Sequence, residues 1–321
     1  MNFIQYIKQA WKAGTSGGTP LSPDRLNHME DGIKNNNNMI SELNNNIIHN
    51  IPRLVPKNIT SYYTDGSLWK RLNGTDGYSL FQDIYVGDYI KMSRPISAKN
   101  PDSNNQATGS QYVTIASIDG LMNNGDNPVT YHHLVMVPGQ GFDGTQHFGT
   151  SRMNPTNTTV GGYKGSELNT SVIGAVVTSG STASDATINQ QLYAEFGTHL
   201  KTTRELISIT INATGYNRIG TNSGCSNDWE WANMQAILMS EVEVYGSIVW
   251  SSSGHDTGNA NHQFELFTHS KSAINNRSAY YWLKDVATAS DFCRCNYNGG
   301  SGYGNAGDSW YFVRPRFVIA A

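Results

Sequence analysis

The last part of the chain, residues 279–319, guides the interpretation of the rest. It begins with AYYWLKDV at 279–286 and ends with FVRPRFVI at 312–319. Both runs are rich in the apolar and aromatic side chains that favour strands. Between them, residues 292–311 read FCRCNYNGGSGYGNAGDSWY, which is dominated by Asn, Tyr, Gly, Ser, Asp and Arg. The sequence therefore predicts two strands that hold a long polar loop at both ends.

The composition of this polar segment favours binding over catalysis. Tyr supplies a large, rigid contact surface at low entropy cost, and Ser, Gly and Asn supply adaptable hydrogen bonds, as in antibody binding loops. A catalytic loop would instead show one or two ionisable groups at fixed positions. A low-complexity surface loop without a ligand is the alternative. The flanking strands favour binding because they would fix both ends of the loop.

Three short motifs in this region carry a family resemblance. Residues 282–284 (WLK), 292–293 (FC) and 313–317 (VRPRF) surround the Asn/Tyr/Gly/Ser-rich run. Together they resemble the C terminus of the variable proteins of diversity-generating retroelements. The resemblance implies a C-type-lectin-like fold and a hypervariable region at about 270–321.

The residue types of the polar segment agree with that resemblance. In such systems, error-prone reverse transcription changes the adenines of chosen codons. An AAC-type codon can then encode Asn, Tyr, Ser, Asp, Gly, Arg, Ala, Cys or His, but not Trp, Lys, Glu, Gln or Met. Within residues 294–311, Trp310 is the only member of the excluded set. Trp310 is therefore either a fixed framework residue or a departure from the pattern.

The polar segment also contains the candidate ligand contacts. Their side chains are expected to project into solvent, whereas the apolar residues around them are expected in the core. The candidate ligand-binding positions are Arg294, Asn296, Tyr297, Asn298, Ser301, Tyr303, Asn305, Asp308, Ser309 and Tyr311. The expected core residues are Trp282, Phe292, Val313, Phe317 and Ile319.

Length and charge limit the classes of function. The chain has 321 residues, a formal net charge of −3 and 15% charged residues. This argues against a nucleic-acid partner, which requires a basic surface. We expect no membrane insertion and no secretion signal, because no apolar stretch has the necessary length or flanks. The three cysteines do not make a disulfide framework, so reduced thiols are expected.

Residues 22–50 predict a coiled-coil helix. Ser22 and Pro23 suit its N-cap and first helical position. Apolar residues and two asparagines then alternate at spacings of three and four, which is a heptad seam. The seam comprises Leu26, Met29, Ile33, Asn36, Ile40, Leu43, Ile47 and Asn50. Because helix propensity is low here, we expect partner helices in a parallel homotrimer, favoured over a dimer. A helix packed on its own domain is the alternative.

Residues 1–21 predict a segment for attachment to the virion. An apolar patch at 3–11 precedes glycines and a proline that break helical structure. Such a short patch needs a partner to fold on; a disordered terminus is the alternative. Residues 18–33 (GTPLSPDRLNHMEDGI) resemble the N-terminal region of tail and baseplate proteins of phages of Gram-positive bacteria. This second resemblance implies contact with other tail proteins.

The remaining chain predicts a loop-rich neck over 51–80 and a ligand-binding domain over 81–321. Strands are expected at 84–86, 89–92, 111–118, 132–137, 203–211 and 235–239, and helices from Ser166 (with Leu168, Val172 and Val176 on one face) and over 188–200. This element order, with a long excursion before the last strand, resembles a C-type-lectin-like domain of the formylglycine-generating-enzyme-like variant. The predicted fold class is α+β.

No metal site and no cofactor are expected. His132 and His133 are adjacent, so on a strand they would point to opposite faces and make poor joint ligands. Cys293 and Cys295 lack a second Cys/His pair at zinc spacing.

Enzymatic alternatives have weaker support than binding. Glu241 and Glu243, on one face of an extended segment, would make an acid–base pair of a glycosidase; a carboxylate that caps a helix is the favoured interpretation. Cys225 has no local support as a nucleophile. Residues 228–231 (DWEW) suggest a sugar platform, but the triplets Glu-Pro-Asn and Trp-Asn-Asp of calcium-dependent lectins are absent. Fold resemblance alone does not assign a carbohydrate ligand.

These features together predict a phage or prophage tail receptor-binding protein, not an enzyme. It would be located in the virion after assembly in the bacterial cytoplasm. Its partners would be a bacterial host-surface receptor (protein or glycan) and other tail or baseplate proteins. A tail-associated glycan hydrolase and a purely structural tail fibre are the alternatives.

Overall fold

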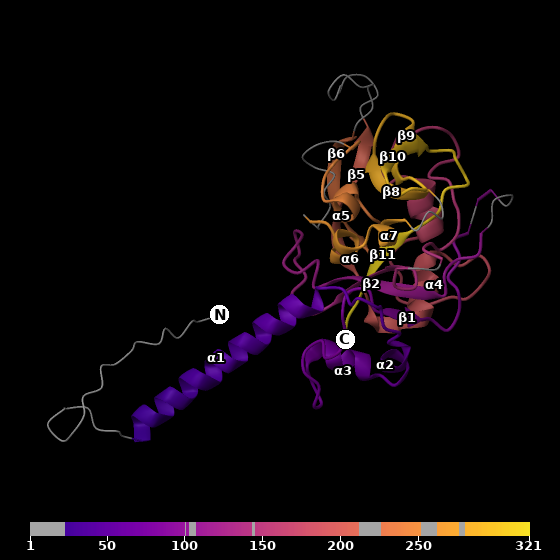
Figure 1. Ribbon diagram of the computed structural model, residues 1–321. Coiled ribbons are helices and arrows are strands. Elements are labelled where there is room, and N and C mark those ends of the chain that lie inside the picture. Colours follow the sequence, from indigo (N-terminus) through magenta and orange to yellow (C-terminus); the bar gives the residue numbers. More distant parts are fainter. Residues whose placement is uncertain are drawn as a thin grey trace. The chain divides into compact units, whose positions relative to one another are not determined.

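The computed structural model describes residues 23–99, 101–102, 107–142, 145–211, 226–251, 262–275 and 280–321. The chain divides into two compact units, one that ends at Ile48 and one from His49 to Ala321. Figure 1 shows their helices and strands. The expected attachment segment at 1–21 lies outside the described residues. Among the described helices, none has the length and hydropathy that a membrane crossing requires.

The predicted long helix is present as α1 (Pro23–His49). It begins at Pro23, whose fixed φ angle and missing N–H suit the first helical turn. Along α1, the seam residues Leu26, Ile33 and Ile40 are 48%, 63% and 65% exposed. These apolar side chains are therefore accessible to a partner helix.

The expectation of a loop-rich neck over 51–80 is wrong. The helices α2 (Thr60–Thr64) and α3 (Ser67–Asn73) lie there, and Leu68 and Leu72 of α3 are fully buried. Gly66 and Gly74 flank α3 in the left-handed conformation, which glycine adopts without strain. The compact unit therefore begins upstream of the expected boundary at 81.

The main sheet is antiparallel and is built around the C-terminal strand β11 (Pro315–Ile319). Its order is β1-β2-β3-β11-β4, and β7 also pairs with β11. The other strands are β1 (Tyr89–Lys91), β2 (Tyr112–Ile118), β3 (Leu134–Pro138), β4 (Leu200–Lys201) and β7 (Ala236–Leu238). Every residue of β3 and β11 is buried. The strands predicted at 89–92, 111–118, 132–137 and 235–239 are confirmed with small shifts of their ends.

The strand expected at 84–86 does not form. Gly87 takes a φ of +91°, and Asp88 donates its N–H to the Tyr85 carbonyl at 3.1 Å. These two features make a turn that leads directly into β1.

Two helices lie between β3 and the strand predicted at 203–211, as expected, although the second ends at Phe196 and Leu200, its expected last residue, begins β4. They are the short π-type helix η2 (Leu168–Ile173) and α4 (Ile188–Phe196), which the 3₁₀ turn η3 (Gly197–His199) follows. A capping box between Thr187 and Gln190 starts α4. The expected helical position of Val176 is wrong, because η2 ends at Ile173 and the Val176 side chain is 38% exposed.

A separate pair of long strands follows these helices. β5 (Thr203–Ile211) confirms the predicted strand, whereas its antiparallel partner β6 (Ser226–Met234) was not predicted. The short helices α5 (Glu241–Tyr245), α6 (Glu265–His269) and α7 (Lys271–Ile274) come next.

A buried group of charges joins β11, β5 and α5. Arg316 donates to the Glu205 carboxylate through Nη1 and Nη2 at 2.8 and 2.6 Å, and to Glu243 Oε1 through Nε at 2.7 Å. All three side chains are fully buried. Burial of such charges is tolerated only when each is paired, so this trio ties three distant parts of the chain together.

The described chain thus combines helices with antiparallel sheets, and sheets dominate. This confirms the α+β class that the sequence predicted.

Candidate functional site

The predicted binding segment folds into strands and not into one long loop. β8 (Tyr281–Val286), β9 (Asp291–Cys295) and β10 (Ser301–Asn305) form an antiparallel sheet in the order β10-β9-β8, drawn in yellow in Figure 1. β9 and β10 pair along their whole length, from Asp291–Asn305 to Cys295–Ser301. The polar residues therefore sit on a hairpin with a defined register.

A tight turn joins β9 to β10. Asn296 N–H donates to the Gly300 carbonyl at 2.7 Å, and Gly299 N–H donates to the Asn296 carbonyl at 2.8 Å. Gly299 has a φ of +84°, which glycine adopts without strain. Tyr297 and Asn298 occupy the exposed part of this turn.

Side chains alternate between solvent and interior along β10. Tyr303 and Asn305 are exposed and Ser301 is half-buried, whereas Gly302 and Gly304 are buried. A Cβ on Gly304 would lie 2.7–2.9 Å from the side chain of Tyr311. Glycine at 304 therefore lets the Tyr311 ring pack directly against the strand.

Replacing Gly304 with alanine is expected to lower the free energy of unfolding by roughly 1–3 kcal/mol, the usual cost of overpacking. The matched control is Gly300→Ala, whose Cβ would meet Asn298 Oδ1 at 3.2 Å and Asn296 Nδ2 at 3.7 Å, with no ring beside it among these nearest atoms. We expect that control to stay within about 0.5 kcal/mol of the wild type. Urea unfolding of both variants measures the difference, and equal values would contradict the packing argument.

An aromatic cluster lies beside the hairpin. The ring of Tyr280 makes edge-to-face contacts with Tyr297, Trp310 and Tyr311 at centroid distances of 5.6, 5.1 and 5.6 Å. The guanidinium of Arg294 lies 4.3 Å from the Tyr280 ring centroid. Tyr297 and Trp310 are 54% and 45% exposed. The cluster therefore presents two aromatic faces on a rigid base.

A second exposed aromatic pair involves β10. Trp250 and Tyr303 are 41% and 43% exposed, and their rings meet edge to face at 4.9 Å. Ser301 Oγ donates to Glu241 Oε1 at 2.8 Å. Glu241 Oε2 accepts the backbone N–H groups of Val249, Trp250 and Ser251 at 2.9–3.0 Å. A buried carboxylate thus connects the Trp250 segment to the hairpin.

Most candidate ligand positions are accessible, but two are not. Tyr297, Asn298, Tyr303 and Asn305 are exposed, and Arg294, Asn296, Ser301 and Asp308 are partly exposed. Tyr311 is 3% and Ser309 is 9% exposed. The expectation that these last two side chains project into solvent is wrong. Tyr311 packs on Trp282 at 4.3 Å, and Ser309 Oγ donates to Asp102 at 2.9 Å.

The expected core around the segment is confirmed. Trp282, Phe292, Val313, Phe317 and Ile319 are all fully buried.

Sequence reasoning missed three aromatic residues of this surface. Tyr280 and Trp250 were not candidates, and Trp310 was singled out only because its residue type breaks the codon pattern. Tyr280 lies directly before β8 in a run read as strand. Nothing in the sequence brings Trp250 near Tyr303, because their contact depends on the fold of the hairpin.

Burial controls the protonation of two groups in the cluster. Burial raises the pKa of Tyr311 to about 12, and burial also raises the pKa of Asp308. The two side chains hydrogen-bond to each other. The Tyr311 hydroxyl therefore stays protonated over the physiological range of pH.

The carboxylate pair considered for catalysis has a structural role. Glu241 and Glu243 lie on α5, not on an extended segment, and both are fully buried. Glu243 forms the capping box of α5 with Ser240, and both oxygens of Glu241 accept hydrogen bonds from the chain. Neither carboxylate faces solvent.

The histidine and cysteine candidates are likewise separated from the hairpin's exposed surface. His133 is fully buried and accepts the Leu121 N–H at its Nε2 (3.1 Å), while His132 contacts Asp119 at 2.7 Å. Cys293 and Cys295 are buried, and Cys225 lies outside the described residues. Within the described part of the chain, no three His, Cys, Asp or Glu side chains gather as a metal site would require.

His147 makes the stability of this region sensitive to acid. Its ring packs on Phe312 at 3.8 Å, and its Nδ1 accepts the Gly149 N–H at 3.1 Å, which requires a neutral ring. Burial, with a smaller effect of Arg314, lowers the pKa of His147 to about 3. Because the folded state favours the neutral ring, His147 contributes stability that is fully present above about pH 6.5. This contribution is lost as the pH falls toward 3.

Between pH 7 and pH 5, the His147 contribution should fall by about 2 kcal/mol. His147→Asn keeps a hydrogen-bond acceptor but cannot be protonated. We expect the difference in unfolding free energy between these pH values to shrink by about that amount in the variant. Urea titrations at the two pH values measure this. If the unfolding free energy changes between pH 7 and pH 5 by the same amount in the variant and in the wild type, His147 does not titrate on unfolding.

Comparison with protein-family models, with curated proteins and with solved structures finds no match for this chain. Function is therefore inferred from the residues and their geometry.

Proposed function

We propose that this chain is a phage or prophage tail protein that binds a receptor on the bacterial host surface through the β9–β10 hairpin and its aromatic neighbours. The observation that carries the proposal is the separation of roles on β10. Tyr303 and Asn305 project outward, whereas Gly302 and Gly304 face the interior. A surface of this kind accepts changes of its exposed side chains without disturbing the strands.

The composition of the exposed surface supports a binding role. Tyr and Trp are enriched at the energetic centres of protein interfaces. Here Tyr297, Tyr303, Trp250 and Trp310 are between 41% and 54% exposed. Asn298 and Asn305 add amides that donate and accept hydrogen bonds. The proposed ligand is a protein or a glycan of the cell surface.

We assign the unit from His49 to Ala321 to the C-type-lectin-like class, in the formylglycine-generating-enzyme-like variant. Support comes from the order of its elements. Two helices, η2 and α4, precede the strand-rich half, and the excursion β8–β10 directly precedes the central strand β11. In this assignment the hairpin is the diversified region of a retroelement variable protein.

The proposal includes a parallel homotrimer formed through α1 and attachment of the N terminus to the virion. The accessible seam residues Leu26, Ile33 and Ile40 support the association of α1 with copies of itself. Several identical sites on one particle raise the overall strength of attachment by orders of magnitude without new contacts. Moderate affinity at each site is therefore sufficient.

Sequencing the DNA that flanks the gene tests the diversification directly. We expect a near-copy of the codons for residues 270–321 beside a reverse transcriptase gene. The copy should differ only where it carries adenines, at codons of exposed positions such as Tyr297, Tyr303 and Asn305. The codons for Gly304 and Trp310 should be unchanged. The absence of such a copy would contradict the diversification, and receptor binding would then depend on the attachment assay alone.

A further inference from the structure

Three large apolar side chains are exposed just after α1. Ile51, Leu54 and Val55 are 53%, 97% and 75% exposed, and we refer to them as the apolar collar. Single exposed apolar residues are normal, but a cluster of them marks an interaction surface.

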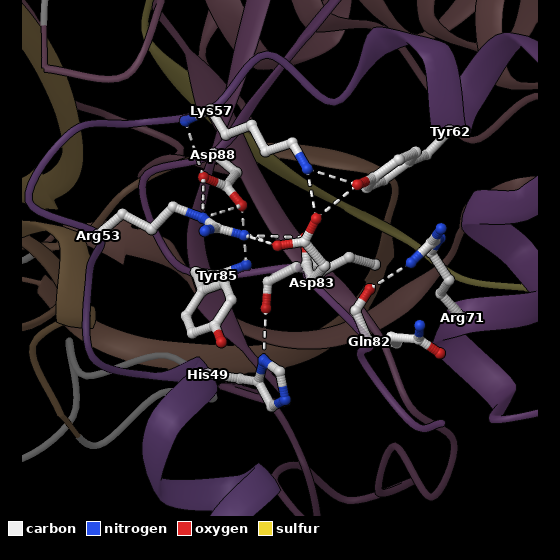
Figure 2. A network of polar contacts seen from close by, with 10 residues as sticks. His49, Arg53, Lys57, Tyr62, Arg71, Gln82, Asp83, Tyr85 and Asp88 are labelled. Atoms are coloured by element: carbon white, nitrogen blue, oxygen red, sulfur yellow. Dashed lines mark hydrogen bonds and ion pairs between the residues drawn. The ribbon is translucent and has the colours of Figure 1, made fainter. Parts of the chain in front are cut away.

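A polar network fixes the segment that carries the collar (Figure 2). Asp83 accepts hydrogen bonds from Arg53, Lys57 and Tyr62. Asp88, fully buried, accepts the Arg53 Nε–H at 3.1 Å and the Lys57 backbone N–H at 2.9 Å. Burial alone would raise the pKa of Asp83, but the bonds from Lys57, Tyr62 and Arg53 hold it well below its usual range. The network therefore keeps its charge, and Arg53 and Lys57 point inward.

The backbone of this segment is held at both ends. Val86 N–H donates to the His49 carbonyl, and Tyr89 N–H donates to the Lys57 carbonyl, both at 3.0 Å. The prolines of the sequence IPRLVP restrict the backbone between these anchors. Because Arg53 points into the network while Leu54 and Val55 follow it, the apolar side chains are presented to solvent by an ordered segment.

We propose that the apolar collar packs against the collars of other copies of this chain and continues the coiled-coil interface onto the domain. The inference rests on the proposed parallel association of α1. The helix that carries the seam ends at His49, and Leu54 and Val55 follow that end within six residues.

Chain connectivity identifies the second copy as the occupant. In a parallel bundle the C-terminal ends of α1 lie together. An extended chain from residue 49 to 54 spans at most roughly 18 Å, so each collar stays close to the ends of the partner helices. The linked collars are then present at high effective concentration for one another.

The test uses the full-length chain with Leu54→Asp and Val55→Asp together. Because like charges would meet in the assembled collar, we expect self-association to weaken at least about tenfold, measured by sedimentation equilibrium. The matched control is Val160→Asp, since Val160 is an apolar residue with 70% exposure away from the collar segment. That control should associate as tightly as the wild type. In addition, Leu54→Cys should cross-link copies under mild oxidation, whereas Val160→Cys should not.

A helix variant separates failure of the collar from failure of the coiled coil. Ile33→Asp with Ile40→Asp should dissociate the assembly if α1 holds it together. A monomeric wild-type chain would overturn both the coiled coil and the collar. If the helix variant dissociates while the collar variant assembles as tightly as wild type and Leu54→Cys forms no cross-link, the collar proposal alone is wrong.

Discussion

Replacing Arg316 with methionine is expected to lower the free energy of unfolding by roughly 3–5 kcal/mol, the range seen when one partner of a buried ion pair is removed. Methionine keeps an unbranched apolar stem but cannot donate to Glu205 or Glu243. Both carboxylates are fully buried and would lose their cation. The loss is large because water cannot reach them to replace the bonds at 2.6–2.8 Å. Urea unfolding at neutral pH measures it.

Arg204→Met is the matched control for this prediction. Arg204 also makes a two-pronged pair with a carboxylate, that of Asp126, at 2.8–2.9 Å. The side chains of this pair are 27% and 37% exposed, so water screens the charges and the pair contributes about 0–1 kcal/mol. If Arg316→Met and Arg204→Met lower the free energy of unfolding by similar amounts, burial does not increase the contribution of the Arg316–Glu205–Glu243 trio to stability.

Replacing Tyr297 and Tyr303 together with alanine is expected to weaken attachment to host cells by about a hundredfold or more, because exposed aromatic residues act as binding hot spots. The melting temperature should change by less than about 3 °C, since substitutions on the surface cost little stability. The two rings are 54% and 43% exposed and meet the rings of Tyr280 and Trp250 edge to face. Cell-binding assays with the purified full-length chain, together with calorimetry, measure both quantities.

Two tyrosine controls make this result interpretable. Tyr131→Ala removes a ring with 39% exposure elsewhere on the domain and should leave attachment unchanged. Tyr311→Ala removes a buried ring and should lower stability by roughly 3–5 kcal/mol. A large loss of stability in the Tyr297/Tyr303 variant would show that these rings belong to the core, and unchanged attachment would refute the assignment of the binding surface.

The interior of the candidate site could be anticipated because burial follows local pattern. Trp282, Phe292 and Phe317 were predicted as core from their place in apolar runs, and all are fully buried. The outward alternation on β10 could not be read, since the sequence SGYGN has no apolar residue to mark an interior face. Its interior positions are glycines, and the close approach of the Asn296 side chain to Gly302 and of the Tyr311 ring to Gly304 explains them.

The wrong expectations about exposure also arise from contacts between residues distant in sequence. Tyr311 and Ser309 have the residue types of a binding surface. Yet the Tyr311 ring packs on Trp282, and Ser309 donates a hydrogen bond to Asp102. Residues 51–80 carry the glycines and prolines of a linker, yet α3 buries Leu68 and Leu72 in the domain. Composition reports which side chains can be exposed, and tertiary contacts decide which of them are.

The sequence by itself determined the elements that local periodicity encodes: the long helix α1, the strands β2, β3, β5 and β11, and the helix α4. It also determined which residue types are available for binding. Only the tertiary structure decided the register of the β9–β10 hairpin, the pairing of Arg316 with Glu205 and Glu243, and the meeting of Trp250 with Tyr303. Periodicity is a property of neighbouring residues. The pairing of Arg316 and the contact of Trp250 with Tyr303 instead join parts far apart in the chain and form only when the domain closes around them, while the hairpin register depends on the turn at Gly299, which periodicity does not encode.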